Sequence, residues 1–271
     1  MTAVTEKRPT TAEVIMLGTG TSVGVPALGC NCDVCKSDNP RNHRTRCSVA
    51  IRTERATVLI DTAPDMRTQL LRESIPLVHA VIYTHEHADH LFGLDDLRLF
   101  PFRLGTPVPL YCEPTVEARI RKSYDYAFSD RAPTHPGATP RLEFETIHAD
   151  APFQVLGLQV QPIRMSHGPH FDVLGFRIGN FAYCTDTNYI PESSLELLKG
   201  LDVLVIDALR RKPHPTHFSV SEATEIARQL KVPRTYLTHI CHDLEHETAN
   251  ASLPDGIELA YDGLRFQIQV G

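Results

Sequence analysis

The chain has 271 residues, 42% of them apolar, and a formal net charge of −6. That length and apolar content allow a substantial buried core, arranged as one large domain or two small ones. The negative charge and the lack of a long basic run argue against electrostatic binding of nucleic acid. Fourteen His and seven Cys are an unusual stock of metal ligands for a chain without Trp.

Residues 1–12, MTAVTEKRPTTA, are polar and predict a flexible N-terminus ahead of a single domain over 13–271. They lack the apolar segment of a signal peptide, and no stretch of the chain is as long and apolar as a membrane span. We therefore expect a cytoplasmic protein without a membrane partner. In that compartment clustered cysteines hold metal more often than they form disulfides.

The first predicted strand, 13–17, is followed by a glycine-rich turn over 18–24. No Gly-Lys-Ser/Thr sequence follows this turn, so we interpret it as a tight loop beside the site, not a phosphate loop. Cys30, Cys32 and Cys35 come next in the pattern CxCxxC. Three thiols suit a tetrahedral zinc and leave one position for a distant ligand; a reduced cluster without metal is the alternative. The candidates for that fourth ligand are His43, Cys47, Cys241 and His242.

Strands are then expected over 48–53, 56–61 and 78–83, and helices over 65–74 and 91–100. The last strand and the last helix flank a dense polar cluster: His85, His87, Asp89 and His90. The first two imidazoles are two residues apart and so point the same way in an extended backbone. Three imidazoles and a carboxylate suit zinc, manganese or iron, whereas a solvated polar loop would be the plain alternative.

The spacing HxHxDH resembles the signature of the metallo-β-lactamase superfamily. The resemblance implies an α/β fold, the αβ/βα sandwich, with two mixed sheets flanked by helices. It also implies a third His, a bridging Asp and a last His, each at the end of a later strand. His167, Asp186 and His239 follow the predicted strands 158–164, 181–184 and 234–238.

By this resemblance, one metal is held by His85, His87 and His167, and a second by Asp89, His90 and His239, with Asp186 as the bridge. The resemblance also makes Asp61 a support for the ligand loop, although a turn or cap before Pro64 explains it equally well.

The remaining pattern alternates strands and helices. Strands are predicted over 108–112, 142–147, 153–155, 173–178 and 202–207, and helices over 115–122 and 191–199. A capping box formed by Ser219 and Glu222 predicts a further helix that runs through Lys231. The segment 123–140 mixes aromatic and polar residues, which is as typical of a lid as of a surface excursion.

Two metals held in this way lower the pKa of bound water and stabilise in-line displacement at phosphorus, but the same chemistry serves an acyl carbon. His217 is one imidazole more than the metals need. It resembles the general acid of the phosphodiesterase branch, and with Asp89 it completes the predicted catalytic pair. His214, between two prolines, is the weaker rival, and an ordinary exposed His is the alternative for either.

The cysteine motif together with Thr238-His239-Ile240-Cys241-His242 resembles the PhnP-like phosphodiesterases. This implies His242 as the fourth ligand of a structural zinc, beside two divalent ions (zinc or manganese) in the active site. The expected partner is a small cyclic or nucleotide-like phosphodiester, not nucleic acid, and a homodimer is compatible with the sequence. The alternative is a PqqB-like or other metalloprotein, oxidative or thioester-directed. PqqB shares the Cys motif, but the complete HxHxDH set favours a hydrolase.

Overall fold

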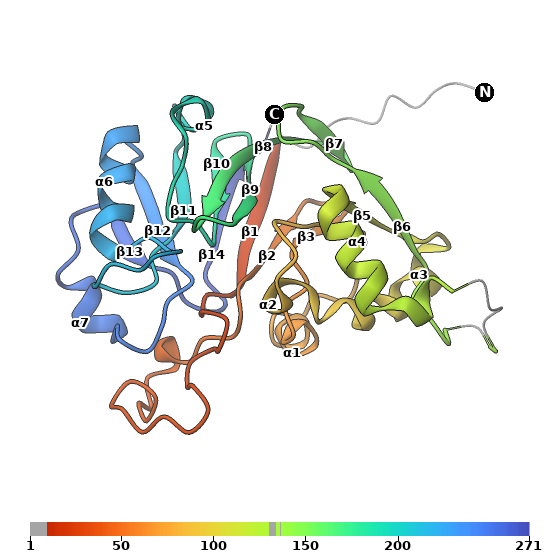
Figure 1. Cartoon of the computed structure of the whole chain (residues 1–271), viewed down its shortest axis with the longest axis horizontal. Coiled ribbons are helices and arrows are strands. Elements are labelled where there is room, and N and C mark those ends of the chain that lie inside the picture. The colour runs from red at the N-terminus through yellow and green to blue at the C-terminus, as the bar shows by residue number, and fades with distance from the viewer. Residues whose placement is uncertain (1–9, 130–133, 136, 271) are drawn as a thin grey trace.

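The computed structural model describes residues 10–129, 134, 135 and 137–270 (Figure 1). Within them, fourteen strands form two seven-stranded sheets. The first sheet has the order β14-β1-β2-β3-β4-β5-β6. Its strands are Thr11–Gly18 (β1), Ser48–Arg52 (β2), Thr57–Ile60 (β3), Ala80–Ile82 (β4), Val108–Cys112 (β5), Leu142–Thr146 (β6) and Arg265–Gln269 (β14).

The second sheet has the order β13-β12-β11-β10-β9-β8-β7. Both sheets are mixed: β1 and β2 pair antiparallel, for example, whereas β10, β11 and β12 run parallel. The strands of the second sheet are Phe153–Val155 (β7), Leu158–His167 (β8), Phe171–Ile178 (β9), Phe181–Cys184 (β10), Val203–Asp207 (β11), Arg234–Thr238 (β12) and Ile257–Leu259 (β13).

Helices cover the outer faces of the two sheets (Figure 1). They are Met66–Arg72 (α1), Ala88–Leu91 (α2), Phe100–Leu104 (α3), Pro114–Ser123 (α4), Glu192–Leu197 (α5), Val220–Leu230 (α6) and His246–Asn250 (α7). Three 3₁₀ helices span Pro40–Asn42 (η1), Leu94–Leu99 (η2) and Asp125–Ala127 (η3). As predicted, a capping box formed by Ser219 and Glu222 begins α6.

The core has three layers, because both faces of each sheet are buried. In β1, Val14 and Met16 belong to the central layer between the sheets. Ile15 and Leu17 belong to the layer that also contains α1 residues, since alternate side chains of a strand point to opposite faces. Burial on both faces explains why the strands read as nearly continuous apolar runs. The predicted αβ/βα sandwich is confirmed.

The prediction of one helix over 91–100 is wrong. The structure has instead the short α2, the 3₁₀ helix η2 and then α3. Gly93 explains the break, because its backbone N donates to the Thr62 carbonyl (2.9 Å) and not to a helix carbonyl. A Cβ at this position would lie 2.1 Å from the Ala63 carbonyl oxygen, so the chain approaches its neighbour as only glycine allows.

The chain ends also differ from the prediction. Residues 1–9 of the predicted flexible terminus lie outside the described residues, but β1 begins at Thr11, where a flexible segment was expected. Thr11 pairs with Gln269 and Ala12 with Ile268, both in β14. No element was predicted beyond residue 238, so β14, β13 and α7 were missed. The pairing of β1 with β14 therefore gives both of these segments a regular strand structure.

In the segment 123–140, residues 130–133 (with Arg131) and 136 lie outside the described residues. The described start of the segment packs against its neighbours: Tyr124 Oη donates to the Leu91 carbonyl (3.2 Å). The Arg121 guanidinium lies 5.0 Å from the ring centre of Phe128 and 4.5 Å from that of Phe144.

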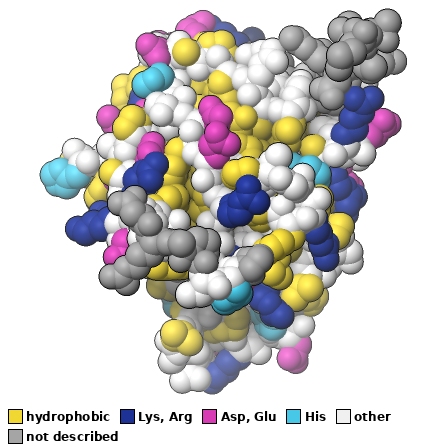
Figure 2. Space-filling view, turned by 90° about the vertical axis from the view of Figure 1, so that its right-hand side faces the viewer, with side chains coloured by type: hydrophobic (Ala, Val, Ile, Leu, Met, Phe, Trp, Pro, Cys, Tyr) yellow, Lys and Arg dark blue, Asp and Glu magenta, His cyan; other side chains and the backbone are white. Residues whose placement is uncertain are grey.

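Lys and Arg side chains are interspersed with acidic and apolar ones on the face of the molecule that lies at the right-hand side of Figure 1 (Figure 2). No helix among the described residues is long and apolar enough to cross a membrane.

Candidate functional site

The strand topology collects polar residues at one edge of the second sheet. β10, β11 and β12 run parallel, and β8 has the same direction because β9 is antiparallel to both β8 and β10. The carboxyl ends of these four strands therefore meet at one edge. In the first sheet β3 and β4 are parallel, and their carboxyl ends face the same region. The residues at or just after these strand ends are His167, Asp186, Asp207, His239, Asp61 and His85.

One group of side chains consists of the imidazoles of His85, His87 and His167, whose ligand atoms lie within 4.8 Å of one another. The Thr84 hydroxyl donates its only hydrogen to Asp61 Oδ2 (2.8 Å), so it accepts from His85 Nδ1 (3.0 Å). His167 Nδ1 donates to the Thr216 carbonyl (2.8 Å). Both rings therefore keep an unprotonated Nε2, the atom that a metal requires.

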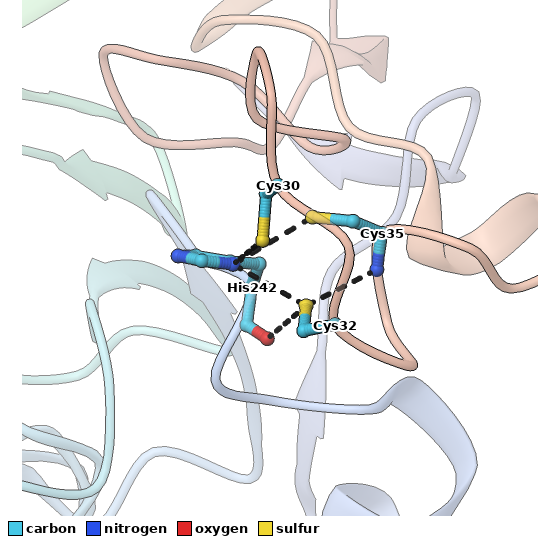
Figure 3. A group of neighbouring side chains, drawn as sticks. All are labelled: Cys30, Cys32, Cys35 and His242. Carbon is cyan, nitrogen blue, oxygen red and sulfur yellow. Dashed lines mark hydrogen bonds between the residues drawn. The ribbon is translucent and has the colours of Figure 1, made fainter.

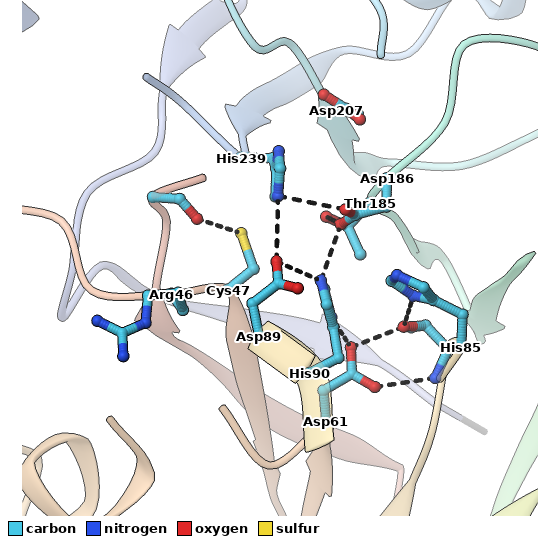
Figure 4. Close-up of polar contacts among 12 residues, drawn as sticks. Arg46, Cys47, Asp61, His85, Asp89, His90, Thr185, Asp186, Asp207 and His239 are labelled. Atoms are coloured by element: carbon cyan, nitrogen blue, oxygen red, sulfur yellow. Dashed lines mark hydrogen bonds and ion pairs between the residues drawn. The ribbon is translucent and has the colours of Figure 1, made fainter. Parts of the chain in front are cut away.

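The second group consists of Asp89, His90, Asp186 and His239, whose ligand atoms again lie within 4.8 Å of one another (Figure 4). His90 Nε2 lies 3.2 Å from Asp186 Oδ2 and 3.4 Å from Asp89 Oδ2. His239 Nε2 lies 3.2 Å from Asp186 Oδ1. Asp186 also groups with His167, so its carboxylate stands between the two sets, as expected for a bridge.

Asp61 holds His90 of the second group directly and contacts the first group through Thr84, the neighbour of His85. It is fully buried, and its carboxylate accepts from His90 Nδ1 (2.7 Å) and from the backbone N of Thr84 (2.9 Å). A carboxylate behind a histidine fixes the tautomer that leaves Nε2 free for a metal. Of the two interpretations that the sequence left open, the structure favours support of the ligand loop over a simple helix cap.

Charge is strongly concentrated here. Burial disfavours charge on His90, yet Asp186, Asp89 and Asp61 outweigh it and raise the pKa of His90 well above its usual value. Burial likewise opposes protonation of His239, but Asp186 raises its pKa to about 9. Burial, with His90 next to it, lowers the pKa of His85 well below its usual value. The buried carboxylates thus favour positive charge in the site. Protonated histidines can provide this charge, and a divalent cation would provide it equally.

The backbone is also unusual at these strand ends. Asp61, Asp186 and His239 have φ values of 65°, 54° and 59°, in the left-handed region. A non-glycine residue there costs on the order of 1–3 kcal/mol, which persists only where the surrounding structure fixes the conformation. Each of the three residues lies one or two positions after a strand end, so the left-handed backbone occurs where the chain leaves the sheet beside the site.

A His–Asp pair adjoins the two groups. His217 is buried, and its Nδ1 donates to Asp207 Oδ2 (2.7 Å). A ligand atom of His217 lies within 4.8 Å of those of His167 and Asp186, and its ring is stacked 4.6 Å from that of His239. Asp207 also accepts from the backbone N of Thr187 (2.8 Å), which holds the carboxylate in place.

The residues present fit two divalent cations. Among the described residues, buried His85 Nε2 has no hydrogen-bond partner, although such atoms are normally satisfied. His90 Nε2 and His239 Nε2 lie 3.2 Å from Asp186 oxygens as charge pairs but make no hydrogen bond either. The donor chemistry, imidazole nitrogen and carboxylate oxygen, suits zinc or manganese. Together these observations support the seven residues predicted as ligands, whose assignment stays a proposal.

A separate cluster joins the N-terminal loop to the end of β12 (Figure 3). The sulfur atoms of Cys30, Cys32 and Cys35 lie 3.2, 3.4 and 3.6 Å from His242 Nδ1. Zinc with Zn–S of about 2.3 Å and Zn–N of about 2.0–2.1 Å has S–N edges of about 3.6 Å in a tetrahedron. Of the four candidates for the fourth position, the structure brings only His242 into this group within the residues it describes.

The thiols of this cluster differ in acidity. The backbone N–H of Cys35 and the His242 ring lower the pKa of Cys32 to about 6, whereas burial raises the pKa of Cys35 to about 11. The lowered pKa of Cys32 favours its thiolate, the form in which a cysteine binds a metal. Cys241 and Cys47 lie outside the cluster, and burial raises the pKa of both.

We predict that Cys32→Ser lowers the melting temperature by about 5–10 °C, because a zinc ion bound by this cluster would tie two distant segments together in the folded state only. The zinc content should fall by one ion per chain while the other metals stay. Cys241→Ser, next to His242 but outside the cluster, is the matched control. Elemental analysis and thermal unfolding check both variants, and an unchanged zinc content in Cys32→Ser would sink the assignment.

Two residues of the site were missed by the sequence analysis as functional positions. Asp207 ends the predicted strand 202–207, as Asp186 follows another, so the same strand-end pattern signals it. Phe171, whose ring centre lies 4.8 Å from that of His87, carries no signal in the sequence because an apolar residue in a hairpin is ordinary.

The chain is similar to a protein family and to several solved structures. Residues 56–240 match the family described as Beta-lactamase superfamily domain. A solved structure of a diphosphatase from the PhnP family is 42% identical, with a TM-score of 0.89, over 96% of this chain and 98% of that one. Zinc-bound PqqB from Methylobacterium extorquens is 21% identical with a TM-score of 0.76 over 94% of this chain and 99% of that one, which shows the fold alone.

Two of the curated relatives that match by sequence differ in their described activity. An octanoyltransferase of Porphyromonas gingivalis is 41% identical over 253 residues, 92% of this chain and 50% of that protein. Coenzyme PQQ synthesis protein B of Rhodopseudomonas palustris is 31% identical over 164 residues, 54% of this chain and 50% of that protein. The chain thus spans about half the length of the curated relatives that it matches.

Proposed function

This chain belongs to the metallo-β-lactamase superfamily as a PhnP-like hydrolase, and from that premise we propose that it is a metal-dependent phosphodiesterase. The substrate would be a small cyclic or nucleotide-like phosphodiester. When bound, two divalent ions held by the predicted seven ligands would activate water and neutralise charge on the phosphate.

One observation carries this proposal: a histidine that neither donor set needs lies next to both. Cleavage at phosphorus breaks a P–O bond, and an alkoxide that leaves needs a proton. We expect His217 to donate that proton, because its Nδ1 donates to the Asp207 carboxylate, which would stabilise a protonated ring. Asp89, whose side chain is 12% exposed, would accept a proton from the attacking water.

One relative, the diphosphatase, favours phosphorus as the centre of attack without fixing which bond is cleaved. The diphosphatase covers nearly the same length as this chain and supports phosphoryl chemistry. It also makes a diphosphate linkage the nearest rival to a phosphodiester. Both substrates would use the same proton donor, although a phosphate that leaves from a diphosphate needs a proton less than an alkoxide does.

A second candidate function is hydrolysis of a thioester or another acyl compound. The observation that favours it is the 41% identity to the octanoyltransferase, although half of that protein has no counterpart in this chain. A PqqB-like oxidative role rests on a match over 54% of the chain. That role has no leaving alkoxide to protonate, whereas the proposed phosphodiester cleavage would give the His217–Asp207 pair this task.

The proposal is tested by screening the purified protein with manganese, zinc or nickel against three substrate classes. These are cyclic and linear phosphodiesters, diphosphates such as ADP-ribose, and acyl thioesters such as octanoyl-coenzyme A. We expect turnover of phosphodiesters at least tenfold above that of the other classes. Thioester hydrolysis without phosphodiester hydrolysis would transfer the assignment to the second candidate.

A further inference from the structure

We propose that Phe171 binds a planar aromatic group, such as a nucleobase, attached to the phosphate of the substrate. This inference rests on the proposed phosphoester hydrolysis and narrows its substrate class. Phe171 is the first residue of β9 and pairs with His167, the last residue of β8. It is 42% exposed although its ring packs directly against the site.

The ring contacts two of the predicted metal ligands. Its centre lies 4.8 Å from that of His87 at an interplanar angle of 71°, and 6.3 Å from that of His167. Both separations are in the range of favourable aromatic pairs. A substrate phosphate bound at a metal held by these histidines would lie close to Phe171. The group attached to that phosphate could then contact the exposed part of the phenyl ring.

Phe171 belongs to the hairpin formed by β8 and β9 (Figure 1), and several contacts hold this hairpin in place. The backbone N of Gly168 donates to Asn188 Oδ1 (2.7 Å), and Asn188 Nδ2 donates to the Pro215 carbonyl (3.0 Å). A Cβ on Gly168, whose φ is +70°, would lie 2.6 Å from the Thr216 methyl group. On the other side, the backbone N of Leu174 donates to the Thr84 carbonyl (3.0 Å). Because the hairpin is already fixed, the binding of a ligand to this ring should cost little conformational entropy.

A rigid, half-exposed phenyl ring suits a planar partner better than a charged one. Every nucleobase has a π-face, and stacking on an aromatic side chain changes affinity about 5- to 100-fold when the ring is removed. Because this contact lies away from the reacting bond, it should strengthen binding of substrate and transition state alike. Its loss should appear in KM more than in kcat.

The first experiment compares Phe171→Ala with the wild type on two five-membered cyclic phosphodiesters, 2′,3′-cyclic AMP and ethylene phosphate. Only the first carries a base. We expect kcat/KM for 2′,3′-cyclic AMP to fall about 5- to 100-fold through KM, and that for ethylene phosphate to change less than twofold. Phe171→Trp should restore the first rate. Phe102→Ala, which removes a 55% exposed phenylalanine on α3, is the matched control.

An equal loss on both substrates would assign Phe171 to positioning His87 and overturn the proposal, as would no loss on either. A second measurement stands apart from turnover: calorimetric binding of AMP and of ribose 5-phosphate to the metal-loaded protein. We expect AMP to bind more tightly, and Phe171→Ala to remove that preference. Wild type that binds both equally would refute the aromatic contact. AMP preference without any turnover would instead reject the hydrolase and keep the contact.

Discussion

Asp89→Ala is expected to abolish turnover of even an activated ester such as bis-p-nitrophenyl phosphate, a loss of about 10³-fold or more in kcat. Asp89 is the carboxylate that belongs to the second donor set alone, and burial does not prevent its ionisation. Although burial opposes the charge, His90 and His239 lower the pKa of Asp89 far below its usual range. The variant loses both this anionic donor and the proposed proton acceptor.

Steady-state kinetics with elemental analysis checks this prediction. Asp150→Ala, which removes an exposed aspartate in the turn before β7, serves as the matched control and should retain full activity. The content of zinc at the cysteine cluster should be unchanged in both variants. A rate near that of the wild type in Asp89→Ala would argue against the proposed second metal position.

The second large effect concerns His217, and its size should depend on the leaving group. General acid catalysis contributes about 10²–10⁴-fold. His217→Ala should lose this factor on 2′,3′-cyclic AMP, which expels an alkoxide. The loss should be much smaller on bis-p-nitrophenyl phosphate, because p-nitrophenolate leaves without a proton. Steady-state rates at saturating metal on both substrates give the comparison.

Three roles of His217 are separated by this comparison. An equal loss on both substrates removes the general-acid role and indicates that His217 orients the phosphate. Little change on either substrate indicates a structural residue. Asp207→Asn should show the same dependence on leaving group with a smaller loss, since the ring remains but its orienting carboxylate is gone. His148→Ala, an exposed imidazole before β7, is the control.

The sequence predicts the sandwich and the cluster of strand-end ligands because both depend on local patterns. Buried strands read as apolar runs, and a polar candidate ligand (His85, His167 or Asp186) stands at the last residue of β4, β8 or β10 or within three residues after it. The HxHxDH spacing adds a ligand set that needs no tertiary information. The two sheets, and the carboxyl ends that share one edge, then follow from the fold that this spacing implies.

Other features depend on contacts that no local pattern reveals. Thr11 and Ala12 belong to a strand because they pair with β14, some 250 residues later in the chain. Spacing alone did not choose among the candidates for the fourth position of the cysteine cluster; the family resemblance implied His242, and the end of β12 brings that residue to the cysteine loop. The helix expected over 91–100 breaks at Gly93 because the Ala63 carbonyl lies too close for a side chain. The role proposed for Phe171 follows from the position of its ring, 4.8 Å from that of His87, which no local pattern reveals.

The most direct test of the central claim is a titration of the chelator-treated protein with manganese, followed by hydrolysis of a phosphodiester at each step. The protein concentration should be well above the metal dissociation constants, so that the added metal binds stoichiometrically. The account predicts no activity without metal and a plateau at two equivalents per chain beyond the zinc of the cysteine cluster. Activity that persists without metal, or a plateau at one equivalent, would contradict it.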